Sequence, residues 1–213
     1  MENSSKIILD LCGGTGSWSK PYKDAGYDVR VITLPDYDVN KWVYRYKEKV
    51  LNPVVEGKVY GILAAPPCTM FSMARTKAKT PRNLVEGMKC VRSCLDIIWS
   101  AMEQEMPTAK RKVNLKFWAL ENPERGMLKY FLGEPPFVFQ PWMFGDEYKK
   151  DTAIWGWFNK PEFTHPKLKK KLPKFDKLKT KEIHGEFYGK FDRQTRRSIT
   201  PQGFAKAFFL SNP

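Results

Sequence analysis

Short apolar runs and longer amphipathic segments alternate along the first two thirds of the chain. Four apolar runs are typical of buried parallel strands, at residues 6–11, 28–34, 60–65 and 117–122. A helix is expected at 18–25, where Gly26 is its stop signal. A longer helix is expected at 83–106, because apolar residues recur there in steps of three and four: Leu84, Met88, Val91, Leu95, Ile98 and Met102. This alternation predicts an α/β fold with a mostly parallel sheet covered on both faces.

The pattern changes after Gly133. Two aromatic segments, FVFQPWMF and DTAIWGWF, are separated by a polar turn and predict an antiparallel hairpin at the edge of the sheet. Near the end of the sequence, Pro201 is expected at the first helical position, behind Thr200 as the cap.

Composition adds a strong positive charge to this picture. The chain has 213 residues, a length typical of one domain, and is 42% hydrophobic, which is enough for a sizeable core. Its 37 Lys and Arg against 23 Asp and Glu give a net charge of +14. A polyanionic partner is therefore expected, with nucleic acid first and an anionic membrane surface second.

Other features argue against several classes of protein. No apolar run reaches the length of about 18 residues that a membrane-spanning helix needs. The polar start is unlike a secretory signal, and four cysteines do not make a disulfide scaffold. We therefore expect a cytoplasmic protein without a membrane partner.

Basic residues concentrate in residues 159–197, which hold 13 Lys and Arg against 5 Asp and Glu. This stretch has no clean hydrophobic period and is interpreted as a basic insertion, although an ordinary solvated surface segment has the same composition. The predicted organisation is a main domain at 1–158, the insertion at 159–197 and a helix at 198–213 that returns to the main domain.

The first candidate site is the turn after the first strand. Its residues are Asp10, Leu11, Cys12, Gly13, Gly14, Thr15 and Gly16. Glycines between a first strand and a first helix let a nucleotide-like cofactor approach the backbone, although a simple tight turn needs them too. An acidic residue about 20 residues further on is expected to hold a ribose, and Asp36 and Asp38 are the candidates.

The second candidate is Cys68, which follows Pro66 and Pro67 at the end of the third predicted strand. Ligand and catalytic groups collect at the carboxyl ends of strands in open α/β sheets, and a rigidly presented thiol there suits a nucleophile. The alternative is that Cys68 is a small buried apolar residue, the usual role of a free cysteine.

The third candidate is Glu121, followed by Asn122 and Pro123, at the end of the fourth predicted strand. A carboxylate that leaves an apolar strand is expected to be partly desolvated, so that its pKa is raised and it can carry a proton near neutral pH. A salt-bridged or exposed loop glutamate is the alternative.

Taken together, DLCGGTG, PPCTMFS and ENP resemble, in this order and spacing, motifs of the DNA (cytosine-5)-methyltransferase family. The resemblance is to the short phage-type members, and it extends to Phe144-Gly145, to residues 152–155 and to RSITP at 197–201. It implies a Rossmann-like S-adenosyl-L-methionine-dependent methyltransferase fold.

The resemblance also implies roles for individual residues. Cys68 would be the nucleophile that adds to carbon 6 of cytosine, protonated Glu121 would stabilise charge at ring nitrogen 3, and Asn122 would orient the base. The target base would leave the duplex stack. S-adenosyl-L-methionine would bind at the glycine turn, with contributions from Trp18, Asp36 or Asp38, Pro66 and Ser198.

The chain departs from the family pattern in three places. Leu34 stands at or near the usual acidic residue of the second strand, and Lys149, Lys150 and Thr152 lie near the place of an absent Gln-x-Arg-x-Arg pattern. No large target-recognition domain fits between Trp157 and Ser198, so only the basic stretch is left to bind DNA.

DNA contacts are expected from two sets of residues. One is the loop after the nucleophile, with Phe71, Ser72, Arg75, Lys77 and Arg82, which could close over an extruded nucleotide or be an ordinary solvated loop. The other set is Lys169, Lys170, Lys171, Arg196 and Arg197.

Cys90 and Cys94 lie four residues apart on the long predicted helix. With only two histidines and no second cysteine pair, core packing is the preferred interpretation and no metal is expected.

The leading hypothesis is therefore a monomeric enzyme that methylates cytosine carbon 5 in DNA, in the host cytoplasm if it is phage-encoded. RNA is an alternative target, and the basic stretch disfavours a free nucleotide. A non-catalytic nucleic-acid binder with the same fold is a further alternative, against which the pair of Cys68 and Glu121 argues.

Overall fold

The computed structural model describes residues 2–42, 54, 58–75, 78–103, 114–165, 167–168, 171–174, 189, 191 and 193–213. Within these residues six strands form one sheet in the order β2-β1-β3-β4-β6-β5. β1 (Ile7–Leu11), β2 (Asp28–Ile32), β3 (Val59–Ala64) and β4 (Phe117–Pro123) are parallel. β6 (Thr152–Trp157) is antiparallel to both β4 and β5 (Phe137–Phe139). The predicted α/β fold, mostly parallel with an antiparallel edge, is confirmed.

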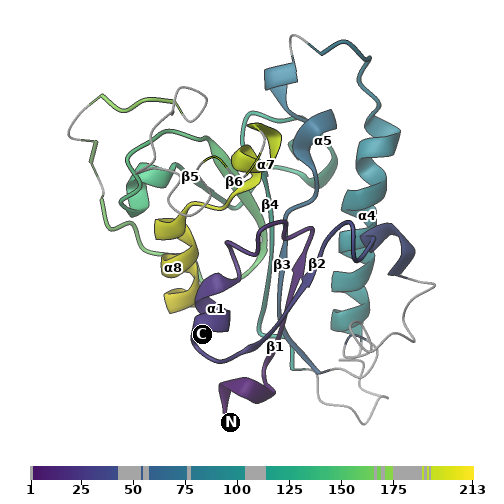
Figure 1. The fold of residues 1–213 in the computed structure, drawn as a ribbon, viewed down its shortest axis with the longest axis vertical. Coiled ribbons are helices and arrows are strands. Elements are labelled where there is room, and N and C mark those ends of the chain that lie inside the picture. The colour runs from purple at the N-terminus through teal and green to yellow at the C-terminus, as the bar shows by residue number, and fades with distance from the viewer. Residues whose placement is uncertain are drawn as a thin grey trace.

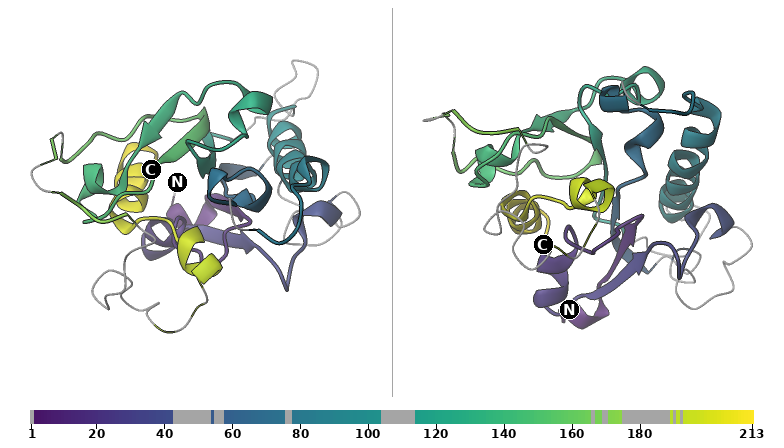
Figure 2. Two further views of the ribbon diagram at one scale, coloured as in Figure 1. Left: turned by 90° about the horizontal axis from the view of Figure 1, so that it is seen from above. Right: turned by 45° about the horizontal axis from the view of Figure 1, so that its top comes forward.

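Helices cover both faces of this sheet. α4 (Leu84–Met102) lies on one face, and α1 (Lys20–Asp24) and α8 (Gln202–Ser211) lie on the other (Figures 1 and 2). The shorter helices are η1 (Asn3–Ser5), η2 (Val39–Lys41), η3 (Cys68–Met70), η4 (Met73–Arg75), α5 (Lys129–Leu132), η6 (Pro141–Phe144) and α7 (Arg193–Ser198). No helix of the described ranges combines the length and the apolar content needed to cross a membrane.

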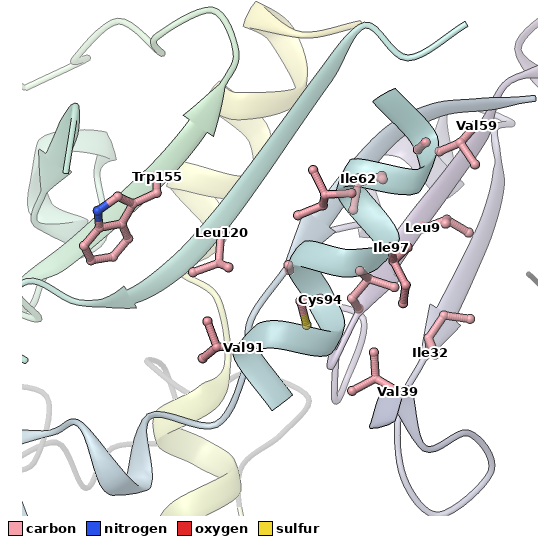
Figure 3. Close-up of a cluster of buried hydrophobic side chains, with 14 of the residues drawn as sticks. Leu9, Ile32, Val39, Val59, Ile62, Val91, Cys94, Ile97, Leu120 and Trp155 are labelled. Atoms are coloured by element: carbon pink, nitrogen blue, oxygen red, sulfur yellow. The ribbon is translucent and has the colours of Figure 1, made fainter. Parts of the chain in front are cut away.

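The alternation of side chains along β1 divides the core in two. Leu9 and Leu11 face α4 and pack with Cys94 and Ile97, and Figure 3 shows this side. Ile8 faces the opposite side, where the core is largely aromatic. Because both faces of the central strands are covered, they are apolar almost throughout, which is why the sequence pattern located them.

The aromatic side of the core joins the C-terminal segment to the first helix. Trp18 contacts Phe208 with ring centroids 5.5 Å apart, and the Tyr22 hydroxyl donates to the Asn212 carbonyl over 2.8 Å. These contacts hold α8 beside α1. About half of the predicted insertion at 159–197 lies outside the described residues, so its boundaries stay a prediction.

Several predicted element bounds differ from those observed. α1 starts at Lys20 rather than at 18, and β2 ends at Ile32 rather than at 34. Pro141–Phe144 is a 3-10 helix instead of strand, and Pro201 occupies the cap position of α8 without a side-chain cap.

The long helix largely follows its prediction. Asn83 caps it, with the Glu86 N–H donating to Asn83 Oδ1 over 3.0 Å. Its buried face is centred on Val91, Cys94, Ile97, Ile98 and Ala101, whereas Met102, which was predicted to be on the buried face, is 38% exposed.

Candidate active site

Three of the parallel strands deliver the candidate residues to one edge of the sheet. The strand order reverses between β1 and β3, because β2 lies on one side of β1 and β3 and β4 lie on the other. Ligands of open α/β sheets bind at such a switch point, beyond the carboxyl ends of the strands. The glycine turn follows β1, Cys68 follows β3, and Glu121 lies near the end of β4. All three segments therefore lie at the edge where a ligand is expected.

Cys68 begins the short helix η3 just beyond β3. Pro66 is buried and Pro67 precedes η3 as its cap, so the two prolines lead the chain stiffly from the strand into the helix. The Cys68 carbonyl accepts from the N–H groups of Phe71 and Ser72 over 2.9 and 2.8 Å. The thiol is therefore held on a tightly hydrogen-bonded turn and is only partly buried.

Charged groups from three segments act on the Cys68 thiol. Burial and the nearby Glu121 carboxyl raise its pKa, whereas Lys150 and Arg197 act in the opposite direction. Burial and Glu121 thus favour the neutral thiol, whereas the two cations favour the thiolate.

Glu121 lies in a mostly enclosed position beside Lys150. Its side chain is 18% exposed, and Lys150 Nζ lies 3.9 Å from Oε1. Burial raises the pKa of Glu121 and Lys150 counteracts it, with a net upward shift. A carboxyl group in this environment can hold a proton at higher pH than an exposed glutamate, as expected for a general acid.

Asn122 connects the ends of β3 and β4. Its Nδ2 donates to the Pro66 carbonyl over 3.1 Å, and the side chain is fully buried. Among the described residues, Asn122 Oδ1 has no hydrogen-bond partner. The amide therefore fixes the segment that carries Cys68 relative to the segment that carries Glu121.

The glycine turn encloses the buried carboxylate of Asp10. The Ser19 hydroxyl donates to Asp10 Oδ2 over 2.5 Å, whereas Oδ1 is buried without a partner in the described part of the chain. A Cβ atom on Gly13 would lie only 2.6 Å from the Asp10 carboxylate oxygens, so only glycine fits there. Burial raises the pKa of Asp10 to about 6.

The turn also has the open backbone that a close ligand requires. Cys12, Gly14 and Gly16 all have positive φ, of 57°, 55° and 70°. Leu11 is fully buried, while Thr15 and Ser17 join their hydroxyl groups in a short hydrogen bond. An unpartnered carboxylate oxygen beneath a glycine cradle fits a ligand with a hydrogen-bond donor, and the hydroxyl groups of a ribose or an ammonium group meet that requirement.

The segment around Ser198 lies against this turn. Ser198 Oγ is 4.0 Å from the position of a Cβ on Gly14, and Arg197, which precedes it in α7, acts electrostatically on Cys68. Figure 1 shows α7 at the edge of the sheet where β1 and β3 end. Arg196 Nε is buried and lacks a hydrogen-bond partner among the described residues.

Two acidic candidates for a ribose differ in their surroundings. Asp36 is exposed, whereas Asp38 accepts from the Asn40 N–H over 3.0 Å and lies 3.9 Å from Lys41. Asp38 thus caps η2, and neither contact selects one of the two as a cofactor ligand.

The two aromatic candidates, Phe71 and Trp18, are too deeply buried to face a ligand. Phe71 is fully buried and contacts Phe131 with ring centroids 6.4 Å apart, so its ring supports the loop instead of facing DNA. Trp18 is only 2% exposed and packs on Phe204 and Phe208. For both residues the expected contact with a ligand is corrected to a packing role in this conformation.

The loop after η3 is shaped by its own arginines. Arg82 donates to the carbonyls of Met70 and Ser72, the latter over 3.2 Å, and Arg75 donates to the Thr80 carbonyl over 2.7 Å. Lys77, Lys169 and Lys170 lie outside the described residues, and Lys171 is exposed.

Sequence reasoning did not assign a role to Lys150. Its signal is the hairpin: β6 is antiparallel to β4, with Thr152 paired to Pro123, so the residues just before β6 lie beside the end of β4. Cys12 lies close to Cys90, with the two Sγ atoms 3.3 Å apart. The spacing of the two residues in the sequence did not predict this contact.

No protein-family model and no curated protein matches this chain. The chemistry of the site therefore has to be inferred from its own residues.

Proposed function

We propose that the protein is an S-adenosyl-L-methionine-dependent enzyme that methylates carbon 5 of cytosine in DNA. The observation that carries this proposal is that the glycine turn, Cys68 and Glu121 lie at the ends of three neighbouring parallel strands, at one edge of the sheet. The Glu121 carboxyl also acts electrostatically on the Cys68 thiol. A nucleophile and a proton donor at one ligand-binding edge can act together on one heterocyclic ring.

The proposed chemistry begins with Cys68. Its thiol loses a proton, helped by Lys150 and Arg197, and the thiolate sulfur forms a bond to carbon 6 of cytosine. Glu121 holds its proton at ring nitrogen 3, where negative charge develops, so that carbon 5 becomes enamine-like and nucleophilic. Transfer of the methyl group to carbon 5 would leave the donor as S-adenosyl-L-homocysteine. Loss of the carbon 5 proton to solvent water then lets the sulfur–carbon bond break and restores the thiolate.

The residues of the glycine turn fit the proposed cofactor. S-adenosyl-L-methionine supplies an electrophilic methyl group on a sulfonium centre. Asp10 offers an unpartnered buried oxygen, and the glycine cradle leaves room for close approach to the backbone. Ser198 lies next to Gly14 and would close the same pocket from the C-terminal side.

The proposed substrate follows from charge and from access. Neither face of a cytosine ring is open in a stacked duplex, so the base has to leave the stack to reach Cys68. The net charge of +14 and the basic stretch at 159–197 favour a long polyanion over a free nucleotide. A purely nucleic-acid-binding protein has no need for a thiol opposed to a protonated carboxyl group.

The test is transfer of a labelled methyl group to duplex DNA, single-stranded DNA, RNA and free nucleotides. DNA that contains 5-fluorocytosine should give a denaturant-stable adduct, because fluorine cannot leave as a cation. Cys68→Ala should abolish both transfer and adduct while the protein still binds the cofactor. Transfer at more than a few per cent of the wild-type rate by Cys68→Ala would remove this thiol from the mechanism.

A second pair of variants separates the proton donor from the fold. Glu121→Gln keeps the shape of the side chain and should slow transfer by about 100-fold or more. Glu124→Gln, three residues away and on the surface beside Arg125, is the matched control and should leave the rate unchanged. Equal effects of the two substitutions, or unfolding of Glu121→Gln, would show that Glu121 is not the acid.

A further inference from the structure

Three thiols lie close together where the glycine turn packs against α4. Cys12 Sγ lies 3.3 Å from Cys90 Sγ and 4.0 Å from Cys94 Sγ, and all three sulfur atoms lie within 4.8 Å of one another. Cys90 and Cys94 extend from one face of α4, and Cys12 approaches them from the turn after β1. Figure 3 shows the Cys94 sulfur within the apolar cluster between α4 and the sheet.

We propose that Cys12, Cys90 and Cys94 bind a divalent thiophilic metal ion, for which Zn²⁺ is the probe. This site is separate from Cys68 and does not depend on the proposed methyl transfer.

The spacing of the sulfur atoms suits a single ion. A zinc ion lies about 2.3 Å from each thiolate, which separates the sulfurs of one coordination sphere by about 4 Å. The Cys12–Cys94 separation of 4.0 Å meets that value, the Cys12–Cys90 separation of 3.3 Å is somewhat shorter, and the third separation is at most 4.8 Å. Three protein ligands leave the fourth tetrahedral position to water or another small donor.

The surroundings favour a divalent ion over a monovalent one. The three cysteines belong to or pack against the main apolar cluster, where a large net charge is costly. The carboxyl groups of Asp10 and Asp38 lie close enough to act electrostatically on Cys12 and Cys90. Three thiolates with a divalent ion leave one negative charge, whereas a monovalent ion such as Cu(I) leaves two.

The backbone of Cys12 supports a role for its side chain. Its φ is 57°, a left-handed conformation that glycine adopts readily and other residues adopt rarely. Glycine would adopt this conformation with less strain. Position 12 instead has a cysteine, whose Sγ lies 3.3 Å from that of Cys90. A bound ion would then tie the glycine turn to α4.

The experiment uses the full chain, purified with a reductant that does not chelate metals, and titrates it with Zn²⁺ against a chromophoric chelator. One equivalent of Zn²⁺ should bind, and Co²⁺ in its place should show the intense near-ultraviolet sulfur-to-cobalt charge-transfer bands of thiolate ligands. Cys12→Gly keeps the left-handed turn, so it should fold, yet it should lower the affinity by about 100-fold or more, beyond the loss of an outer-shell partner. Cys90→Ser should have the same effect, and Zn²⁺ should raise the melting temperature of the wild type but not of Cys12→Gly or Cys90→Ser.

Cys68→Ser is the matched control, because Cys68 does not belong to this cluster, and it should bind Zn²⁺ as the wild type does. The proposal is overturned if the reduced wild type takes up no Zn²⁺, if Cys12→Gly binds it undiminished, or if uptake is lost with Cys68→Ser. Isolation of a Cys12–Cys90 disulfide, together with no Zn²⁺ uptake after reduction, would instead identify the cluster as a redox pair. All of these readouts are independent of methyl transfer, so a failure here leaves the proposed function untouched.

Discussion

The Asn122 amide donates a 3.1 Å hydrogen bond to the carbonyl of Pro66, two residues before Cys68. The bond crosses from β4 to the segment after β3, so the two parts of the chain that carry the candidate nucleophile and acid have a shared buried support. The position of Cys68 relative to Glu121 therefore depends on a side chain that is neither of them.

Removing this support should affect both stability and catalysis. Asn122→Ala leaves the Pro66 carbonyl without its buried donor, which should cost about 1–3 kcal/mol of unfolding free energy. Methyl transfer should fall by more than the remaining folded fraction explains, because Cys68 loses its fixed position. Chemical denaturation and transfer assays at the same temperature measure the two effects. Full activity in a destabilised Asn122→Ala would show that the bond serves the fold alone.

Lys150 should set the pH range of the proposed methyl transfer. It lowers the pKa of both Cys68 and Glu121, so Lys150→Met should raise both. Glu121 then keeps its proton to higher pH and Cys68 ionises only at higher pH, so the whole profile of kcat/KM should move in the alkaline direction. Lys149→Met is the control, because Lys149 is not among the groups that act on either residue. A profile that is lower but unshifted would mean that Lys150 contributes by contact instead of by charge.

Asp10 should limit the stability of the ligand-free protein at neutral pH. Its pKa is raised from 3.8 to about 6 in the folded state, so the folded state binds the proton more tightly than the unfolded chain. The contribution of Asp10 to the free energy of unfolding is therefore greatest below about pH 4. It declines as the pH rises to about 6 and stays low above that. Asp10→Asn should remove the decline and raise the unfolding free energy at pH 8 by up to about 3 kcal/mol.

The same substitution should weaken cofactor binding, because Asp10 Oδ1 is the unpartnered oxygen in the glycine cradle. Urea unfolding between pH 4 and pH 8, together with calorimetry of cofactor binding, measures both. Asp24→Asn, at an exposed surface pair with Lys20, should change neither. A lower stability of Asp10→Asn at pH 8 would contradict the assigned cost of the buried charge.

The basic stretch should bind DNA mainly through phosphates. Replacing Lys169, Lys170 and Lys171 by Gln should flatten the dependence of log affinity on log salt by up to about three units. Binding should weaken similarly for different sequences, since the point charge of a lysine does not read base edges as a bidentate side chain does. Equilibrium binding at several salt concentrations measures this slope.

Lys20→Gln with Lys23→Gln, on the surface of α1, is the control and should leave the slope unchanged. An unaltered slope in the triple variant, or retained affinity with lost sequence preference, would show that residues 159–197 fold into a reader of bases.

The central strands could be predicted from the sequence because they are buried on both faces and are therefore apolar almost throughout. The candidate motifs could be placed at the strand ends for the same reason. The contacts between segments that bring the site residues together could not be predicted from the sequence. Lys150 approaches Glu121 only because β6 is antiparallel to β4, and Cys12 approaches Cys90 only because α4 packs on that face of β1. Neither relation leaves a periodic signal along the chain.

The aromatic residues show a different limit. Phe71 and Trp18 are next to the candidate nucleophile and the glycine turn in the sequence, which favoured a ligand-facing role. Large rings gain most from removal from water, and the core of the folded chain offers each of them a site. Proximity in sequence is therefore a weak guide to where an aromatic ring points.

Glu121 and Asn122 are adjacent in β4, so their side chains project to opposite faces of the sheet. One supplies the proposed proton and the other supports the chain beneath the nucleophile. A slip of one residue in the pairing of β4 with β6 would exchange these positions and turn the carboxyl group away from Cys68. The β4–β6 register pairs Leu120 with Trp155 and Glu121 with Ile154. This register therefore determines on which face of the sheet the Glu121 carboxyl group lies. Substitutions in this hairpin that permit an alternative register should abolish the proposed methyl transfer although they change no residue of the candidate site.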